Sequence, residues 1–215
     1  MDTNGHIYLI HEISPSRDSI THALRMSQYE VHLFSTPAEF FKLTNLLTPA
    51  AVLIKERLHK ICAVQLALVF KSQGRSISTI VLNSDSSPQE IVDSFLRGAS
   101  DFIIGPFIDE KLIPSVKQAI ESDIKQTQLK LRLNSAYERY ERLTSREKDV
   151  CKLIAQGMKT ALIAKVLDIS PATLKIHKAR VYKKLEVTSI VEIVRLTDMV
   201  AKECEPYSHI VKISN

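Results

Sequence analysis

The chain has 215 residues, of which 45% are hydrophobic and 25% are charged, with a formal net charge of +5 at pH 7. This composition is that of an ordinary globular protein, and the length suggests two domains that each have a core. The sequence has no apolar run of membrane-spanning length and no signal-peptide pattern at its start, so we expect a cytoplasmic protein with no membrane contact.

The positive charge is concentrated in the C-terminal third of the chain. Residues 1–120 carry 11 Lys and Arg against 12 Asp and Glu, whereas residues 141–215 carry 14 against 9. A polyanionic partner is therefore expected for the C-terminal part only.

Residues 1–120 alternate short β-rich runs with amphipathic stretches of helical length. The expected strands are Ile7–Ile10, Val31–Phe34, Ala51–Ile54, Ile80–Leu82 and Phe102–Ile104. The expected helices are Arg17–Met26, Pro37–Leu47, Cys62–Lys71, Pro88–Arg97 and Asp109–Ile120. Such alternation predicts an α/β domain built on a doubly wound parallel sheet. The chain has only five glycines and no Gly-rich nucleotide-binding loop.

One segment of this part resembles a known family. Residues 98–107 read Gly-Ala-Ser-Asp-Phe-Ile-Ile-Gly-Pro-Phe and closely match the end of response-regulator receiver domains, which usually read Gly-Ala-x-Asp-Phe-Ile-x-Lys-Pro-Phe. The resemblance implies a five-stranded parallel sheet in the order 2-1-3-4-5.

The residues that carry receiver chemistry are replaced in this chain. Receivers hold Mg²⁺ with two carboxylates after the first strand, where the resemblance places His11 and Glu12. It places Lys55 at the phosphate-accepting aspartate, Asn83 at the hydroxyl after the fourth strand, and Gly105 at the lysine after the fifth. The resemblance thus implies a degenerate receiver that is not phosphorylated.

The environment of Lys55 has two readings. A lysine at the end of a buried strand needs an anion or access to water, so Lys55 either pairs with Glu12 or points into solvent. A shift of one residue would make Glu56 the acceptor, but a glutamate there does not restore the metal site.

Residues 121–142 contain no Gly or Pro and predict a helical linker. Its apolar positions follow a 4-3-4-3 spacing at Leu129, Leu133, Ala136, Tyr140 and Leu143. This seam indicates either a short coiled coil between two chains or a helix that packs on its own domain.

The C-terminal part carries several helix signals. Thr144 and Glu147 form a capping box, and Gly157 is a natural helix end. Thr160 is a candidate cap for a short second helix. Ser170 and Pro171 suit the cap and first position of a third helix, and a last helix follows Ser189. A short helix, a tight turn and a cationic helix predict a helix-turn-helix in an all-α four-helix domain.

The third helix has two different faces on a 3.6-residue wheel. Leu174, Val181 and Leu185 share the side that faces a core. The opposite side carries Ala172, Ile176, Ala179 and Lys183, with Lys175 and Arg180 at its edges. A small apolar strip with basic margins and no acidic residue suits the DNA major groove.

These residues also resemble a family. The residues that carry the resemblance are Leu143-Thr144-Ser145-Arg146-Glu147, Ile163-Ala164, Leu167-Asp168-Ile169-Ser170, Thr173, His177 and Lys184-Leu185. Together they are similar to the DNA-binding domain of LuxR/FixJ-type (NarL-like) regulators. Ala161 departs from the Lys or polar residue usual there. From helix and resemblance together we expect DNA contacts from Thr160, Ser170, Thr173, Lys175, Ile176, Lys178, Ala179, Arg180, Lys183 and Lys184.

Neither metal chemistry nor catalysis has a clear site in the sequence. Cys62, Cys151 and Cys204 are scattered and suit a reducing compartment. His59 and Cys62 have a ligand-like spacing, but no second pair accompanies them. We therefore predict no metal, no cofactor and no enzymatic activity.

The sequence thus predicts a receiver-like domain at residues 1–120, a linker at 121–142 and a helix-turn-helix domain at 143–203. The predicted function is transcription regulation by sequence-specific binding of double-stranded DNA, independent of receiver phosphorylation and performed as a homodimer. RNA polymerase is a candidate partner. One alternative is an adaptor whose degenerate receiver binds a protein or small ligand to control DNA binding. A second alternative is a regulator that is still phosphorylated, on an unusual residue.

Overall fold

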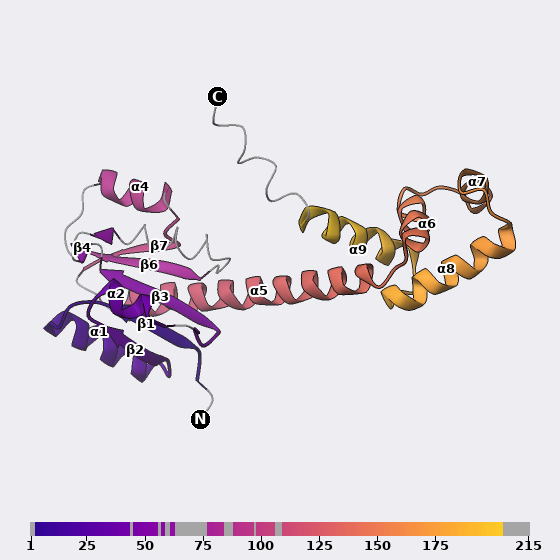
Figure 1. Cartoon of the computed structure of the whole chain (residues 1–215). Coiled ribbons are helices and arrows are strands. Elements are labelled where there is room, and N and C mark those ends of the chain that lie inside the picture. The colour runs from indigo at the N-terminus through magenta and orange to yellow at the C-terminus, as the bar shows by residue number, and fades with distance from the viewer. Residues whose placement is uncertain are drawn as a thin grey trace. The chain divides into compact units, whose positions relative to one another are not determined.

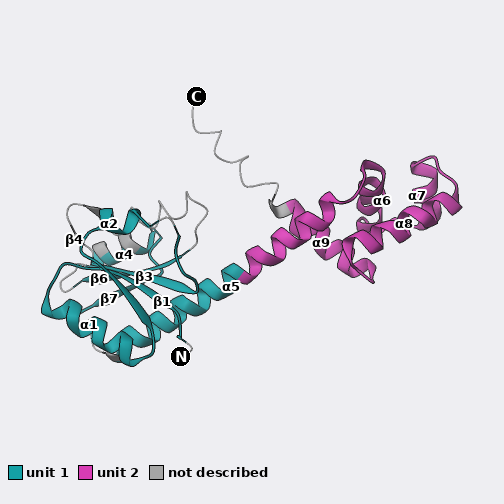
Figure 2. Cartoon of the chain, turned by 60° about the horizontal axis from the view of Figure 1, so that its bottom comes forward, with its two compact units in different colours: residues 1–127 teal, residues 128–215 magenta. Residues whose placement is uncertain are grey.

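The computed structural model describes residues 3–43, 45–55, 57–58, 61–62, 77–83, 88–96, 98–105 and 109–203 (Figure 1). The chain divides into two compact units, residues 1–127 and residues 128–215 (Figure 2). The receiver-like residues Pro106 and Phe107, together with Glu56 and His59, lie outside the described residues, as does most of the expected helix Cys62–Lys71.

The first unit is built on a five-stranded parallel sheet. Its strands are β1 (His6–Ile10), β2 (Glu30–Phe34), β3 (Ala50–Lys55), β6 (Ser78–Asn83) and β7 (Asp101–Ile104). Their order, β2-β1-β3-β6-β7, is the 2-1-3-4-5 order that the resemblance implies. Residues 50–54 of β3 are fully buried, as expected for a strand whose two faces are both covered. The five predicted strands are confirmed.

Helices pack on both faces of this sheet. The first unit contains α1 (Pro15–Met26), α2 (Pro37–Phe41), α4 (Pro88–Leu96) and the first part of α5 (Asp109–Glu141). Ile20 and Leu24 of α1 share one core cluster with Leu112 and Val116 of α5. Phe40 of α2 belongs to the cluster on the other face. The predicted doubly wound α/β architecture is confirmed.

One local prediction in this unit is wrong. The helix expected over Pro37–Leu47 ends at Phe41. One reason is that the backbone N–H of Leu47 donates to the Tyr8 hydroxyl at 2.7 Å instead of to a helical carbonyl. Next to this region β5 (Ile61–Cys62) pairs antiparallel with β4 (Arg57–Leu58), so the first residue of the expected helix Cys62–Lys71 belongs to a strand, and the rest of that helix lies outside the described residues.

The second unit is helical in its described residues, 128–203. It contains the end of α5, then α6 (Ser145–Ala155), α7 (Thr160–Val166), α8 (Pro171–Leu185) and α9 (Ile190–Glu203). Apolar side chains from each of these helices form a single core cluster. The four-helix domain is confirmed. No helix in the described part of the chain is long and apolar enough to cross a membrane.

The apolar seam of the linker divides between core and surface. Ala136 and Leu143 are buried in the core of the second unit, and Tyr140 packs against that core. Leu129 is 54% exposed. The C-terminal end of the seam therefore packs on its own domain, which was one of the two readings left open by the spacing.

Candidate nucleic-acid interface and sheet-edge pocket

Helix α8 begins and ends where its sequence predicts. The Ser170 hydroxyl accepts a hydrogen bond from the Thr173 backbone N–H at 3.1 Å, and Pro171 occupies the first turn. At the other end Glu186 takes a left-handed conformation with φ of 56°, a common way for a helix to stop. These signals fix α8 at 15 residues.

The two faces of α8 separate as the wheel predicts. Leu174, Val181 and Leu185 are fully buried against the core of the second unit. The opposite side is exposed, and Ile176 in its middle has 53% of its surface accessible. Lys175, Ala172, Ala179, Arg180 and Lys183 are the other exposed residues of this face. The helix carries five Lys and Arg and no acidic residue, so its exposed face attracts anions.

Helix α7 precedes α8, and its first residue lies beside one edge of α8. The first residue of α7 is Thr160, and its N-cap is Lys159, which makes no side-chain capping bond. The prediction that Thr160 caps the helix is therefore wrong. Its hydroxyl accepts a hydrogen bond from the Lys178 ammonium at 3.4 Å instead, which places both groups at one edge of α8.

An ion pair between a buried carboxylate of α6 and a partly exposed lysine of α8 links the two helices. The Glu147 carboxylate, only 3% exposed, accepts a hydrogen bond from the Lys184 ammonium at 2.6 Å. It also accepts from the Thr144 backbone N–H at 2.9 Å, which completes the predicted capping box. Burial raises the pKa of Glu147, but the bonds from Lys184 and Thr144 outweigh burial and hold that pKa below its usual value. Lys184, expected to contact DNA, thus has an internal partner.

The predicted pocket residues meet at one edge of the sheet in the first unit. Lys55 is the last residue of β3, and Asn83 is the last residue of β6. His11 and Glu12 follow β1, and the Gly105 backbone N–H donates to the Asn83 carbonyl at 2.7 Å. Because the strands are parallel, their carboxyl ends lie together. The structure brings all five predicted positions to this edge.

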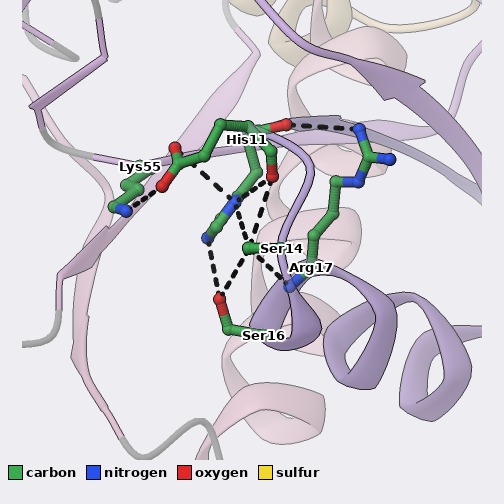
Figure 3. Close-up of polar contacts among 6 residues, drawn as sticks. His11, Ser14, Ser16, Arg17 and Lys55 are labelled. Atoms are coloured by element: carbon green, nitrogen blue, oxygen red, sulfur yellow. Dashed lines mark hydrogen bonds and ion pairs between the residues drawn. The ribbon is translucent and has the colours of Figure 1, made fainter.

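Lys55 forms an ion pair with Glu12 across this edge (Figure 3). The pair decides between the two readings of Lys55 that the sequence left open. The two side chains are 30% and 41% exposed, so the pair contributes about 0–1 kcal/mol to stability. Burial raises the pKa of Glu12, but the hydrogen bond from Lys55 and the neighbouring contacts outweigh burial. The pKa therefore lies below its usual value, and the carboxylate stays ionised. The pair fixes a charge arrangement more than it stabilises the fold.

The His11 ring is buried beside this ion pair, with its Nδ1 3.8 Å from a Glu12 carboxylate oxygen (Figure 3). Its side chain is 1% exposed, and its Nδ1 lies 2.9 Å from the Glu12 carbonyl oxygen. The hydroxyls of Ser14 and Ser16 lie 3.4 Å from its two ring nitrogens (Figure 3). Arg17 donates to the His11 carbonyl at 3.5 Å. These contacts anchor the loop between β1 and α1.

Residues 141–197 match the sequence profile of the bacterial regulatory proteins of the luxR family. This stretch contains α6, α7 and α8 and the first half of α9. The second unit carries a luxR-family domain.

Relatives extend the likeness to both units. Response regulator protein TodT of Pseudomonas putida is 26% identical over 199 residues, which cover 93% of this chain and 88% of TodT. Transcriptional regulatory protein FixJ of Bradyrhizobium diazoefficiens is 28% identical over 196 residues, which cover 91% of this chain and 96% of FixJ.

Solved structures share the architecture. Full-length FixJ from B. japonicum aligns at 26% identity with a TM-score of 0.57, covering 94% of this chain and 99% of FixJ. The response regulator StyR aligns at 20% identity with a TM-score of 0.78 over 90% of this chain and 98% of StyR, which shows the fold. The luxR-family domain and these relatives make the chain a DNA-binding transcription regulator of the response-regulator type.

The receiver-like unit that accompanies the luxR-family domain has a poor donor set for Mg²⁺. This hard cation prefers a near-octahedral set of oxygen ligands. Among the five sheet-edge positions only Glu12 carries a carboxylate, and that carboxylate is paired with Lys55. The cation Lys55 at the strand end would repel a second cation. These five described positions therefore do not supply the oxygen ligands that Mg²⁺ prefers.

The sequence did not reveal two features of the molecule. The Glu147–Lys184 pair joins residues 37 positions apart, and Glu147 was recognised only as part of a capping box. The second feature is a cluster of His6, Glu30 and His32 on β1 and β2. In the sequence the only signal for it is the alternation Glu30-Val31-His32, since both outer residues point to the same side of the strand.

Proposed function

We propose that the chain binds specific double-stranded DNA sites through α8. It acts as a homodimer at promoters, with RNA polymerase as a partner. It works in the cytoplasm, and its receiver-like unit needs no phosphorylation. The observation that carries the DNA-binding part is the exposed, acid-free face of α8, held in place by its buried opposite face. An α-helix of this kind fits the major groove.

The side chains of α8 divide into base readers and phosphate contacts. We assign base reading to Lys175, Ile176 and Arg180, because they flank and fill the small apolar strip formed with Ala179. We assign phosphate contacts to the remaining hydroxyl and ammonium groups on or beside this face, namely Thr160, Ser170, Thr173, Lys178 and Lys183. Lys184 is removed from the phosphate set because Glu147 already neutralises it.

Independence from phosphorylation rests on the chemistry at the sheet edge. An ammonium at position 55 cannot form an acyl phosphate, and the Glu12–Lys55 pair supplies a permanent charge arrangement in the same place. A receiver switches because two packings differ by a small free energy, so a fixed pair can favour one packing permanently. We propose that Lys55 has this role here.

The DNA-binding proposal is tested by the salt dependence of binding by the full chain. Each phosphate contact contributes about 0.9 to the slope of log K against log salt concentration. Replacing Lys178 with alanine is expected to weaken binding to all sequences and to reduce that slope by about 0.9. Fluorescence anisotropy over a range of salt concentrations measures it.

A matched control separates a contact from a general charge effect. Lys152→Ala removes one exposed cation from α6 that is not among the proposed DNA contacts, and should leave the slope nearly unchanged. Equal slopes for wild type and Lys178→Ala would remove Lys178 from the interface. Binding that does not weaken with salt in the wild type would contradict the DNA-binding proposal itself.

A further inference from the structure

Three potential metal ligands converge on the outer part of the sheet. His6 lies at the start of β1, and Glu30 at the start of the edge strand β2 is its register partner. His32 follows two residues later and pairs with Tyr8. Because side chains alternate along a strand, His6, Glu30 and His32 share one face of the sheet. The cluster lies at the opposite strand ends from the Glu12–Lys55 pair.

The spacing of their polar atoms is that of ligands around one ion. His6 Nδ1 lies 3.3 Å from His32 Nε2 and 3.3 Å from a Glu30 carboxylate oxygen. The other Glu30 oxygen lies 4.0 Å from His32 Nε2. Bonds of about 2.0–2.1 Å in a tetrahedral zinc site place neighbouring ligand atoms about 3.3 Å apart. The separations from His6 Nδ1 to His32 Nε2 and to one Glu30 oxygen already have this value. One ligand atom from each of the three residues lies within 4.8 Å of the other two.

The imidazole of His32 is held in place by its packing against Tyr8. Its ring stacks on Tyr8 with centroids 4.9 Å apart and an interplanar angle of 18°. Burial lowers the pKa of His32, the neighbouring Glu30 carboxylate opposes that effect, and His6 adds to the lowering.

The cluster of His6, Glu30 and His32 is open to solvent on one side. The side chains of His6, His32 and Glu30 are 13%, 27% and 53% exposed respectively. An ion can enter from the Glu30 side while the rings remain anchored. Three protein ligands leave a fourth position for water, as in open zinc sites.

We propose that His6, Glu30 and His32 form a binding site for one divalent transition-metal ion of the zinc class. Two imidazoles and one carboxylate are donors that suit Zn²⁺, and Co²⁺ can replace it as a probe, whereas Mg²⁺ prefers oxygen ligands. The ion would join the edge strand β2 to β1. This site stands independently of the proposed DNA-binding function, since it uses no residue of α8 and none of the sheet-edge pocket.

The test is a Zn²⁺ titration of the full, tag-free chain after removal of metals with a chelator. Competition with a chromophoric chelator gives affinity and stoichiometry. We expect one zinc ion per chain at this site, and a loss of affinity of at least roughly tenfold for either His32→Ala or Glu30→Gln. Glu30→Gln keeps the size of an exposed side chain, so it should fold even if removal of the His32 ring disturbs the Tyr8 stack.

Control variants identify the residues responsible. His22→Ala removes an exposed histidine of α1 and should leave the affinity unchanged. His59→Ala combined with Cys62→Ala tests the ligand-like pair noted in the sequence. A Co²⁺ complex at the proposed site should lack the thiolate charge-transfer band that Cys62 would produce.

Several results would overturn the proposal. One is the absence of saturable binding with zinc in large excess, which would mean that the two imidazoles and the carboxylate only hydrogen-bond to one another. Another is a site that survives in Glu30→Gln and His32→Ala but is lost in the His59 and Cys62 variant. Displacement of bound zinc by equimolar Mg²⁺ would also contradict the assigned donor chemistry.

Discussion

An Arg180→Ala chain is expected to bind its specific DNA site more weakly by about 1–3 kcal/mol, the discrimination given by one bidentate contact to guanine. Arg180 is exposed on α8 and borders the apolar strip. A guanidinium there can donate two parallel hydrogen bonds to the O6 and N7 of a guanine. Its loss should relax the preference at one base pair and change random-sequence binding much less.

The matched variant Arg180→Lys keeps the charge and removes the planar fork. It should recover binding to random DNA but not the preference for guanine, because a lysine is a point charge. Competition binding with a series of base-substituted sites at one salt concentration measures both effects. Equal losses for specific and random DNA in Arg180→Ala would assign Arg180 to the phosphate backbone.

Lys184→Ala is expected to destabilise the second unit by roughly 2–3 kcal/mol, somewhat less than for a fully buried pair because Lys184 is partly exposed. The reason is that Glu147, 3% exposed, would lose the cation that compensates its charge. Hydrogen exchange of α6 and α8 peptides in the full chain reports the stability of this unit. Lys183→Ala, which removes the neighbouring exposed lysine, should change stability by less than about 0.5 kcal/mol.

The same pair sets a pH dependence. The folded-state pKa of Glu147 lies below its ordinary value because the bonds from Lys184 and Thr144 outweigh burial. Its stabilisation is therefore complete above the unfolded pKa, roughly 4.3, and is lost as the pH falls through the lower folded pKa. The difference between wild type and Lys184→Ala should shrink in that acid range. A constant difference from neutral to acid pH would show that Glu147 is not the partner that matters.

The fold was largely predictable because strong local signals agreed with it. The apolar runs of β3 and β6 are buried on both faces, and the cap at Ser170 starts α8 where predicted. The shortened α2 shows the limit of such signals. In the stretch where the helix was expected to continue, the Leu47 backbone N–H donates to the hydroxyl of Tyr8, which lies 39 positions away in the sequence. No local sequence pattern contains that contact.

The functional residues were predictable to different degrees. The exposed face of α8 follows from helical periodicity alone. The Glu12–Lys55 pair needed the resemblance to receivers, which places the ends of β1 and β3 side by side. The cluster of His6, Glu30 and His32 depends on the register of β1 against β2, and a shift of one residue would separate the three side chains. Sequence spacing does not fix that register.

The central claim is that the receiver-like unit works without phosphate, and the most direct test is treatment of the full chain with acetyl phosphate and Mg²⁺. Intact mass and affinity for a specific DNA site are measured before and after treatment. A Lys55→Asp variant serves as a second sample, and it too should remain unmodified, because the second metal-binding carboxylate and the fifth-strand lysine are still replaced by His11 and Gly105. We predict unchanged mass and unchanged DNA affinity for the wild type. A stable gain of one phosphoryl group within residues 1–120, accompanied by tighter DNA binding, would contradict the claim.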